Sequence, residues 1–262
     1  MQTIEAIILG LVQGLTEFIP ISSSGHLVIF QTFLSGASDH LFLEFINIGT
    51  LAALLVFFRI RIWGIIKDIF VNKNFKLAIN LLITAIPAGA VGFVLADFIG
   101  DTPFFGSLVV VACTLFIVGV IMVILERLPK ASKVQSLEDL PRRRALLIGL
   151  AQVLALIPGV SRSGSTIIAG RLAGFNPAKA AEYSFLASLP IMIGVTLKIF
   201  LTDTDYLAAN LTGLVIGNVA AFISGLVAVG FLMKFLSRHG LAAFGWYRIG
   251  LALVLAAIIL IQ

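Results

Sequence analysis

Long apolar runs separated by short polar stretches make up most of this 262-residue chain. Such runs approach or exceed the roughly 17–25 residues that an α-helix needs to cross a bilayer. Because they are continuous and do not alternate apolar with polar positions, they do not fit a β-barrel. The pattern predicts six spanning helices, at about residues 41–58, 77–97, 104–126, 183–201, 210–234 and 241–261.

Two further apolar segments, at about 3–34 and 145–172, are interrupted. In each, an apolar stretch of moderate length leads into a proline and a cluster of Ser and Gly, and a second apolar stretch follows. Neither half is comfortably long enough to span alone. A break at membrane depth is tolerated only where the backbone is buried in protein or lines a wet cavity. We therefore interpret both segments as re-entrant helix pairs.

Composition supports an integral membrane protein, since 60% of the residues are hydrophobic, only 12% are charged, and the mean hydropathy is +1.11. The net charge of +5 comes from Lys and Arg that cluster in loops. That distribution is typical of membrane orientation, so we do not expect nucleic acid as a partner. The single cysteine, Cys113, excludes an internal disulfide.

The basic loops set the predicted orientation. Residues 59–76 and 127–144 hold most of the Lys and Arg and are separated by two spans, so both should face the cytoplasm. The first re-entrant pair then enters from outside and the second from the cytoplasm. We expect an all-α polytopic protein with one membrane domain, residues 1–262. Its inverted-topology repeats, about 1–126 and 145–262, are joined by the cytoplasmic loop 127–144.

A motif that occurs twice, 139 positions apart, supports the repeat. From Ile8 to Ile29, 8 of 22 positions meet an identical residue at that shift. The copies differ where chemistry could lie: Glu17 aligns with Leu156, Ser23 with Arg162, and His26 with Ser165. This pattern suggests two half-sites that meet to form one asymmetric site.

The first copy predicts an anion site with a reactive pair. Pro20 ends one helix, and the serines that follow offer N-cap hydroxyls to the next. The free backbone N–H groups there favour phosphate, which makes Ser22, Ser24 and Gly25 candidate substrate-binding residues. Ser23 and His26 lie on one face of the first turn, as nucleophile and base require. Simple capping with a packing histidine is the alternative.

Glu17 is a carboxylate in an apolar helix and therefore a functional candidate. With Gln13, one turn earlier, it could hold a divalent cation such as Mg²⁺ or Ca²⁺ through oxygen ligands. It could instead orient His26 or pair with Arg162.

The second copy surrounds Arg162 with groups suited to phosphate. A guanidinium presents a fork of donors that matches phosphate oxygens. The neighbouring candidates for substrate binding are Ser161, Ser163, Gly164, Ser165 and Thr166. The polar residues Glu44, Glu182, Lys198 and Arg248 also lie in or near spans, and we attribute them to packing or snorkelling.

These motifs resemble the signatures of the undecaprenyl-pyrophosphate phosphatase family, the bacterial bacitracin-resistance proteins. The resemblance rests on Gln13-x-x-x-Glu17, on Pro20–His26 and on Pro158–Thr166, and it covers essentially the whole chain. It implies hydrolysis of undecaprenyl pyrophosphate to the monophosphate, which recycles the lipid carrier of peptidoglycan. It also implies a divalent cation, a bacterial plasma-membrane location and an active site open to the outside. Family members often carry Glu where this chain has Gln13.

By this resemblance, Glu17, Ser23, His26 and Arg162 map onto the family's essential positions. We expect Ser23 to attack the terminal phosphorus with His26 as base or acid, while the rival assignment makes His26 the nucleophile. Because inverted repeats around a midplane site also suit alternating access, the alternative function is a transporter or flippase of a lipid phosphate. The oligomeric state stays open, a homodimer included.

Overall fold

The computed structural model describes residues 3–30, 39–95, 98–99, 102–128 and 134–261. These residues form helices and turns, without strands. Most of the first half consists of α1 (Thr3–Phe18), α2 (Ser23–Phe30), α3 (His40–Phe57), α4 (Arg59–Phe70), α5 (Lys76–Val94), η2 (Pro103–Gly106) and α7 (Leu108–Leu125). The rest consists of η3 (Leu137–Asp139), α8 (Arg142–Val153), η4 (Leu154–Leu156), α9 (Arg162–Leu172), α10 (Pro177–Thr202), α11 (Thr204–Leu236) and α12 (Ala242–Ile261).

Six of these helices are long and apolar enough to cross a membrane: α3, α5, α7, α10, α11 and α12. They coincide with the six predicted spans, although residues 96–97 of the second span lie outside the described residues. The prediction of a polytopic all-α protein is confirmed at this level. The predicted loop 59–76 is wrong over most of its length, because Arg59–Phe70 forms α4, whose apolar positions recur at helical spacing.

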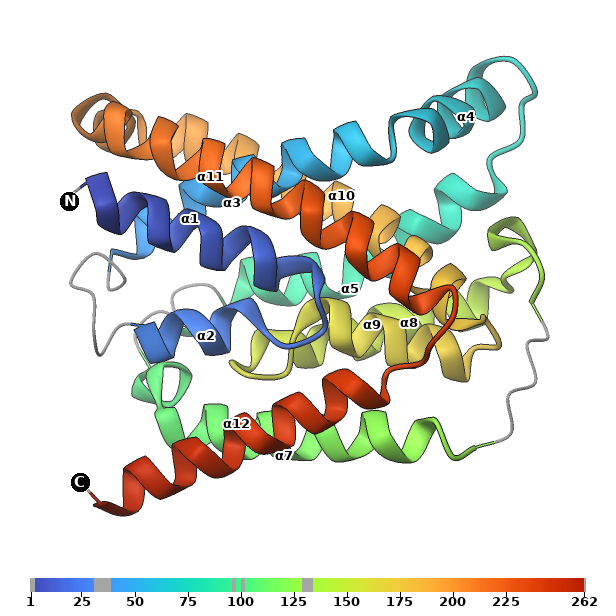
Figure 1. Ribbon diagram of the computed structural model, residues 1–262. Coiled ribbons are helices and arrows are strands. Elements are labelled where there is room, and N and C mark those ends of the chain that lie inside the picture. The colour runs from blue at the N-terminus through green and yellow to red at the C-terminus, as the bar shows by residue number, and fades with distance from the viewer. Residues whose placement is uncertain (1–2, 31–38, 96–97, 100–101, 129–133, 262) are drawn as a thin grey trace.

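The two interrupted segments fold as short helices on either side of a break. In the first, α2 packs against α1, and in the second α9 packs against α8. Figure 1 shows α1 entering the bundle and α2 turning back toward the end from which α1 started. With 16 residues, α1 rises about 24 Å, which is less than the roughly 30 Å of a hydrocarbon core.

Helix partners in the two halves of the chain correspond. α1 packs against α11 and α8 against α5, while α3 packs against α11 and α10 against α5. α3 also contacts α10, and α7 contacts α12. The contacts are symmetric between the two halves. If α1 is exchanged with α8, α3 with α10, α5 with α11 and α7 with α12, the same list of contacts results.

Two aligned glycines allow close approach of the helix backbones in two of these contacts. A Cβ at Gly10 would lie 2.3 Å from the carbonyl oxygen of Gly217 in α11, and one at Gly149 would lie 2.7 Å from that of Thr84 in α5. Small residues let helix backbones approach in this way. The shared glycine of the repeated motif therefore sets how deeply α1 and α8 sit in the bundle.

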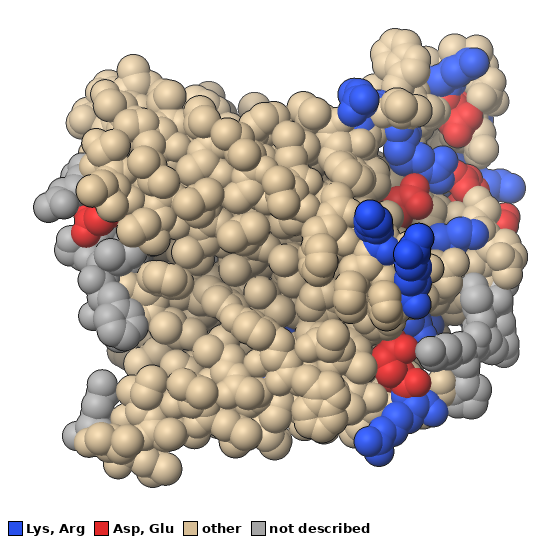
Figure 2. Space-filling view, viewed as in Figure 1, with Lys and Arg blue, Asp and Glu red and all other residues tan. Residues whose placement is uncertain are grey.

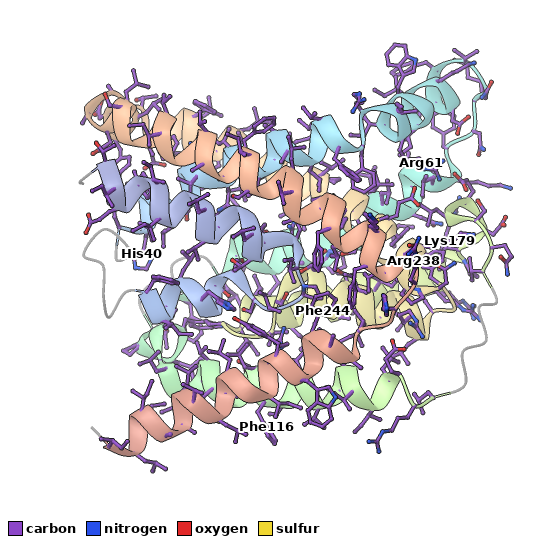
Figure 3. The ribbon with its side chains drawn as sticks, in the orientation of Figure 1. His40, Arg61, Phe116, Lys179, Arg238 and Phe244 are labelled. Carbon is purple, nitrogen blue, oxygen red and sulfur yellow. The ribbon has the colours of Figure 1, made fainter. Side chains whose placement is uncertain are left out.

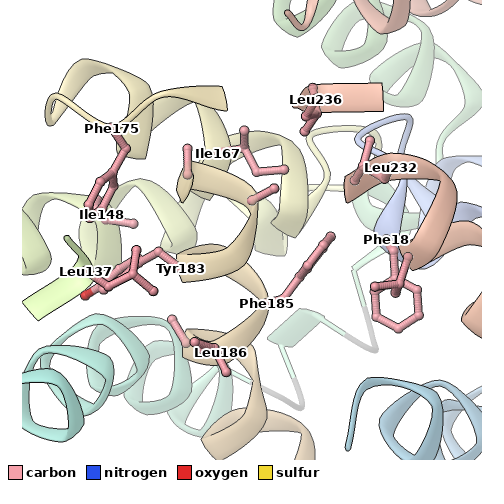
Figure 4. Packing of buried hydrophobic residues seen from close by; sticks show 14 of the residues in the cluster. Phe18, Leu137, Ile148, Ile167, Phe175, Tyr183, Phe185, Leu186, Leu232 and Leu236 are labelled. Carbon is pink, nitrogen blue, oxygen red and sulfur yellow. The ribbon is translucent and has the colours of Figure 1, made fainter. Parts of the chain in front are cut away.

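The largest cluster of buried hydrophobic residues includes residues of the broken helices, such as Phe18 of α1 and Ile167 of α9. Phe18 is fully buried and meets Phe185 of α10 edge to face, with ring centroids 5.5 Å apart (Figure 4). Because Phe18 follows Glu17 directly, this packing fixes the end of α1 and thus the depth of that carboxylate.

Charge is concentrated at one end of the molecule. Figure 2 shows Lys and Arg gathered at one end, with a broad uncharged belt beside them. Arg61, Lys179 and Arg238 lie at this basic end, whereas His40 lies at the opposite one (Figure 3). Arg61 binds Glu138 at 2.7 Å and Glu182 at 3.1 Å, so an ion-pair network ties α4 to α10 and the segment before α8. The two predicted basic loops do share a side.

Candidate functional site

The two breaks have matching local geometry. Ser22 and Ser161, which align in the repeat, both adopt positive φ, at 77° and 76°. The Ser22 hydroxyl accepts from the backbone N–H of Gly25 at 3.2 Å, and the Ser161 hydroxyl accepts from that of Gly164 at 3.1 Å. A non-glycine residue in this region costs on the order of 1–3 kcal/mol, so the surrounding structure must hold both turns.

Glu17 is the centre of the polar site. Its Oε1 accepts from Nη2 of Arg162 at 2.7 Å, and its Oε2 accepts from Oγ of Ser23 at 2.7 Å and from Nε2 of Gln13 at 3.0 Å. The Gln13 amide also donates to Oδ1 of Asn47 at 2.6 Å. Three donors thus meet on one carboxylate, and the Glu17–Arg162 pair joins the two copies of the motif.

His26 has a different set of partners. Its Nδ1 lies 2.7 Å from the carbonyl oxygen of Ser22, and its Nε2 lies 2.8 Å from the hydroxyl of Tyr247 in α12. Since a carbonyl can only accept, Nδ1 carries the proton and Nε2 is left as the basic nitrogen. Between the described residues, no hydrogen bond joins Ser23 to His26. The structure pairs Ser23 with Glu17 and His26 with Tyr247.

The hydroxyls of the second copy are mostly engaged within their own helix or its neighbours. Ser165 and Thr166 both donate to the carbonyl of Arg162, at 3.0 and 2.8 Å, and Thr166 also bonds to Ser184. Ser163 reaches the carbonyl of Glu17 at 3.4 Å. These residues therefore help to place the helix start that carries Arg162.

Arg248 joins both breaks from α12. It is fully buried, and it donates from Nη1 to the carbonyl of Pro20 at 3.1 Å and from Nη2 to the carbonyls of Gly159 and Val160, the latter at 3.1 Å. Of the two explanations offered for Arg248, packing and snorkelling, the structure supports packing. A snorkelling side chain keeps its charged head in water, whereas this one is enclosed.

A cavity of about 1200 Å³ adjoins the breaks. Ser24 of the first break and Pro158 of the second line one part of it, and apolar residues of α5 and α10 line much of the remainder. Glu44 and Lys198 add charge to its wall. A mostly apolar cavity with Ser24 of the α2 N-terminus in its wall suits an amphipathic, anionic ligand.

A divalent cation at Glu17 would find few protein oxygens and would have to take most of its ligands from a phosphate. An ionised carboxylate offers about four lone-pair positions, and Glu17 uses three of them for the hydrogen bonds above. In the described part of the chain, no three His, Cys, Asp or Glu residues gather in a metal-binding group. A cation here would thus resemble magnesium sites that use one or two carboxylates together with substrate oxygens.

Comparison with known proteins identifies the family. A family profile described as "Bacitracin resistance protein BacA" matches residues 6–254. The chain belongs to this family. Curated proteins are also similar to this chain over nearly their whole length. The chain is 37% identical to "Undecaprenyl-diphosphatase 2" of Paramagnetospirillum magneticum, over 99% of this chain and 100% of the relative.

Two further relatives carry similar names. The "Undecaprenyl-diphosphatase" of Bordetella avium is 36% identical, over 97% of this chain and 96% of the relative. That of Ectopseudomonas mendocina is 38% identical, over 97% of this chain and 92% of the relative.

For this bacitracin resistance protein family member, the structure brings together Gln13, Glu17, Ser23 and Arg162, and it places His26 on the same broken helix as Ser23. Sequence reasoning missed Asn47 and Tyr247 and did not connect Arg248 with the two breaks. Both Asn47 and Arg248 had a signal, since each is a polar group within an apolar span. Tyr247 is 221 positions from His26, and nothing in the local sequence pairs them.

Proposed function

We propose that this protein is an undecaprenyl-diphosphatase, a phosphoric anhydride hydrolase that converts a polyprenyl pyrophosphate into the monophosphate and inorganic phosphate. The relatives' names support this activity, and the observation that carries it is the Glu17 carboxylate, bonded to Ser23 from one break and to Arg162 from the other. The proposed nucleophile Ser23, its proton acceptor Glu17 and the phosphate-binding guanidinium of Arg162 are thus in contact. The product would recycle the lipid carrier for peptidoglycan synthesis.

The membrane arrangement that we propose is an inverted-topology repeat with two re-entrant helix pairs. It is supported by the exchange symmetry of the helix contacts and by the matched serines at positive φ. The basic end would face the cytoplasm, and α1 begins at the opposite end. We accordingly place the protein in the bacterial plasma membrane with its active site open to the outside.

The pyrophosphate would lie between the two breaks, with the prenyl chain in the adjoining cavity. Arg162 and the N-termini of α2 and α9 provide the positive potential, and Ser22, Ser24, Gly25, Ser161, Ser163, Gly164, Ser165 and Thr166 form the cradle. Phosphoryl transfer depends mainly on positioning and on stabilisation of charge. Glu17 must then share Arg162 with the phosphate, which keeps the guanidinium aligned before the substrate arrives.

In the first step, Oγ of Ser23 forms a bond to the terminal phosphorus, and the bond from that phosphorus to the bridging oxygen breaks. The polyprenyl monophosphate leaves, and the proton of Ser23 passes to Glu17, its hydrogen-bond acceptor. In the second step, water attacks the phosphoserine and gives its proton to Nε2 of His26. Ser23 recovers its proton from Glu17 as its bond to phosphorus breaks, phosphate is released, and His26 gives the proton taken from water to the solvent.

The rival assignment makes Nε2 of His26 the nucleophile, with Ser23 positioning the phosphate. The two assignments differ in the intermediate that they form. Acid quenching during turnover of a ³²P-labelled prenyl pyrophosphate should leave label on Ser23, because a phosphoserine survives acid and a phosphohistidine does not. Label that is retained only under alkaline quenching, and only while His26 is present, would reverse the assignment.

A divalent cation, Mg²⁺ or Ca²⁺, would be held by Glu17 and the amide oxygen of Gln13 and would neutralise charge on the pyrophosphate when bound. We expect EDTA to abolish phosphate release from farnesyl or undecaprenyl pyrophosphate and either ion to restore it. Undiminished release in EDTA would remove the cation from the proposal. No release by the wild-type protein under any metal condition would contradict the hydrolase itself.

A transporter or flippase of a lipid phosphate is not favoured, because the relatives are named for hydrolysis and a carrier needs no nucleophile.

A further inference from the structure

Arg248 bonds to equivalent points of the two repeats. Pro20 and Gly159, whose carbonyls it holds, align at the same shift of 139 that aligns Ser22 with Ser161. Each held carbonyl lies two residues before a serine at positive φ. One planar guanidinium therefore spans both strained turns, which a point charge such as an ammonium could not do with the same geometry.

The side chain has no counter-ion in the described part of the chain. No ion pair joins Arg248 to a carboxylate there, and its Nε is buried without a hydrogen-bond partner. Enclosing a charge that no counter-ion neutralises costs free energy. Stability alone therefore gives a weak reason for arginine at this position.

The other repeat uses an apolar residue at the corresponding place. A Cβ at Gly119 of α7 would meet the carbonyl oxygen of Gly245 and Cβ of Arg248, and one at Gly245 would meet the carbonyl oxygen of Gly119 and Cβ of Met122. This reciprocal contact matches Arg248 with Met122. The helix packing that surrounds Arg248 in α12 accommodates Met122 at the matching position of α7. Packing therefore does not require arginine, and Arg248 has a role that Met122 does not share.

We propose that Arg248 is a positioning residue that holds the two breaks in register for catalysis. Ser23 directly follows Ser22, and Arg162 directly follows Ser161. The distance between the two turns therefore sets the distance from the Ser23 hydroxyl to the Arg162 guanidinium. Arg248 fixes that distance by holding a carbonyl on each side. This inference rests on the proposed hydrolase activity and adds to it a residue outside the phosphate cradle.

The test compares Arg248→Lys and Arg248→Met with the wild type, using farnesyl pyrophosphate in detergent and measuring kcat and KM separately. Misplacing reacting groups by about 1 Å costs on the order of 100-fold in rate. We therefore expect kcat of Arg248→Met to fall about 100-fold, with KM within about threefold of wild type. The lysine variant should recover part of the rate, because it can reach one side only. Arg238→Met, at an exposed site before α12, is the matched control and should keep wild-type kcat.

Thermal unfolding and gel filtration show which variants are folded. A folded Arg248→Met or Arg248→Lys with kcat within twofold of wild type would overturn the inference. So would a large rise in KM at constant kcat, which indicates uniform binding rather than positioning. If neither variant folds, Arg248 is a stability residue and the proposal fails. Inactive wild-type protein would instead count against the proposed function.

Discussion

Replacing Glu17 by glutamine tests the centre of the site with the smallest change in shape. The carboxylate accepts three hydrogen bonds, from Arg162, Ser23 and Gln13. The amide keeps one oxygen, and its NH₂ group must then face a donor. Arg162 loses its counter-ion, and Ser23 loses a proton acceptor if the amide nitrogen turns toward it.

The structure sets the size of both effects. The side chains of Arg162 and Glu17 are 19% and 13% exposed, so solvent screens this pair only partly. Hydrogen bonds to charged groups contribute about 1.5–3 kcal/mol each, so we expect a loss of about 2–3 kcal/mol in stability. That corresponds to a fall of roughly 5–10 °C in Tm. Loss of the proton acceptor should lower kcat by about 10²–10⁴-fold.

The assay is phosphate release from farnesyl pyrophosphate, with Tm measured on the same preparation. Glu126→Gln is the matched control, because Glu126 pairs with Arg171 at 3.1 Å and is as buried, with 11% of its side chain exposed. Arg171 is nine residues after Arg162 on the same helix, about 13 Å away. The control should lose similar stability but keep its rate. A Glu17→Gln variant within threefold of wild-type kcat, or an equal loss in Glu126→Gln, would refute the reasoning.

Two other substitutions test the packing and the cavity. Gly10→Ala should destabilise the protein by about 1–3 kcal/mol, because its Cβ would lie 2.3 Å from a backbone oxygen of α11. The control is Gly64→Ala, which should not lower Tm because nothing lies within 4 Å of its Cβ. Equal Tm values for the two variants would contradict the close contact at Gly10. Gly194→Leu places a side chain at the wall of the cavity and should raise KM for undecaprenyl pyrophosphate about tenfold, the effect of about 1.4 kcal/mol of lost apolar contact. A wild-type KM there would argue against the cavity as the site of the prenyl chain.

Several features could be predicted from sequence because they depend on local or periodic patterns. Helix length and hydropathy predict the six spans, since the bilayer imposes a minimum apolar length. The alignment of Ser22 with Ser161 predicted two similar breaks, and the structure gives both serines the same positive φ. The family follows from the motifs around Glu17 and Arg162. The Lys and Arg of residues 59–76 and 127–144 predicted that both stretches lie on one side of the membrane. They did not predict the helix α4, because the number of charges in a stretch does not show whether it forms a helix.

The partners of each polar group required the tertiary structure. Spacing suggested that Ser23 would meet His26, since residues three apart share a helix face. The fold instead turns Ser23 toward the end of α1 and His26 toward α12, which returns to the site more than 200 positions later. The partners of Arg248 also could not be predicted from the sequence. Arg248 lies in an apolar run, and only the packing of α12 against both breaks shows which carbonyls it binds.

The sequence by itself determined the membrane helices, the duplicated frame and the residue types available for chemistry, because each is written in hydropathy, repetition or a local motif. The tertiary structure decided which group accepts the hydrogen bond of Ser23, which nitrogen of His26 faces Tyr247, and what joins the two breaks. These depend on contacts between helices far apart in the chain, and such contacts leave no fixed spacing from which to predict them.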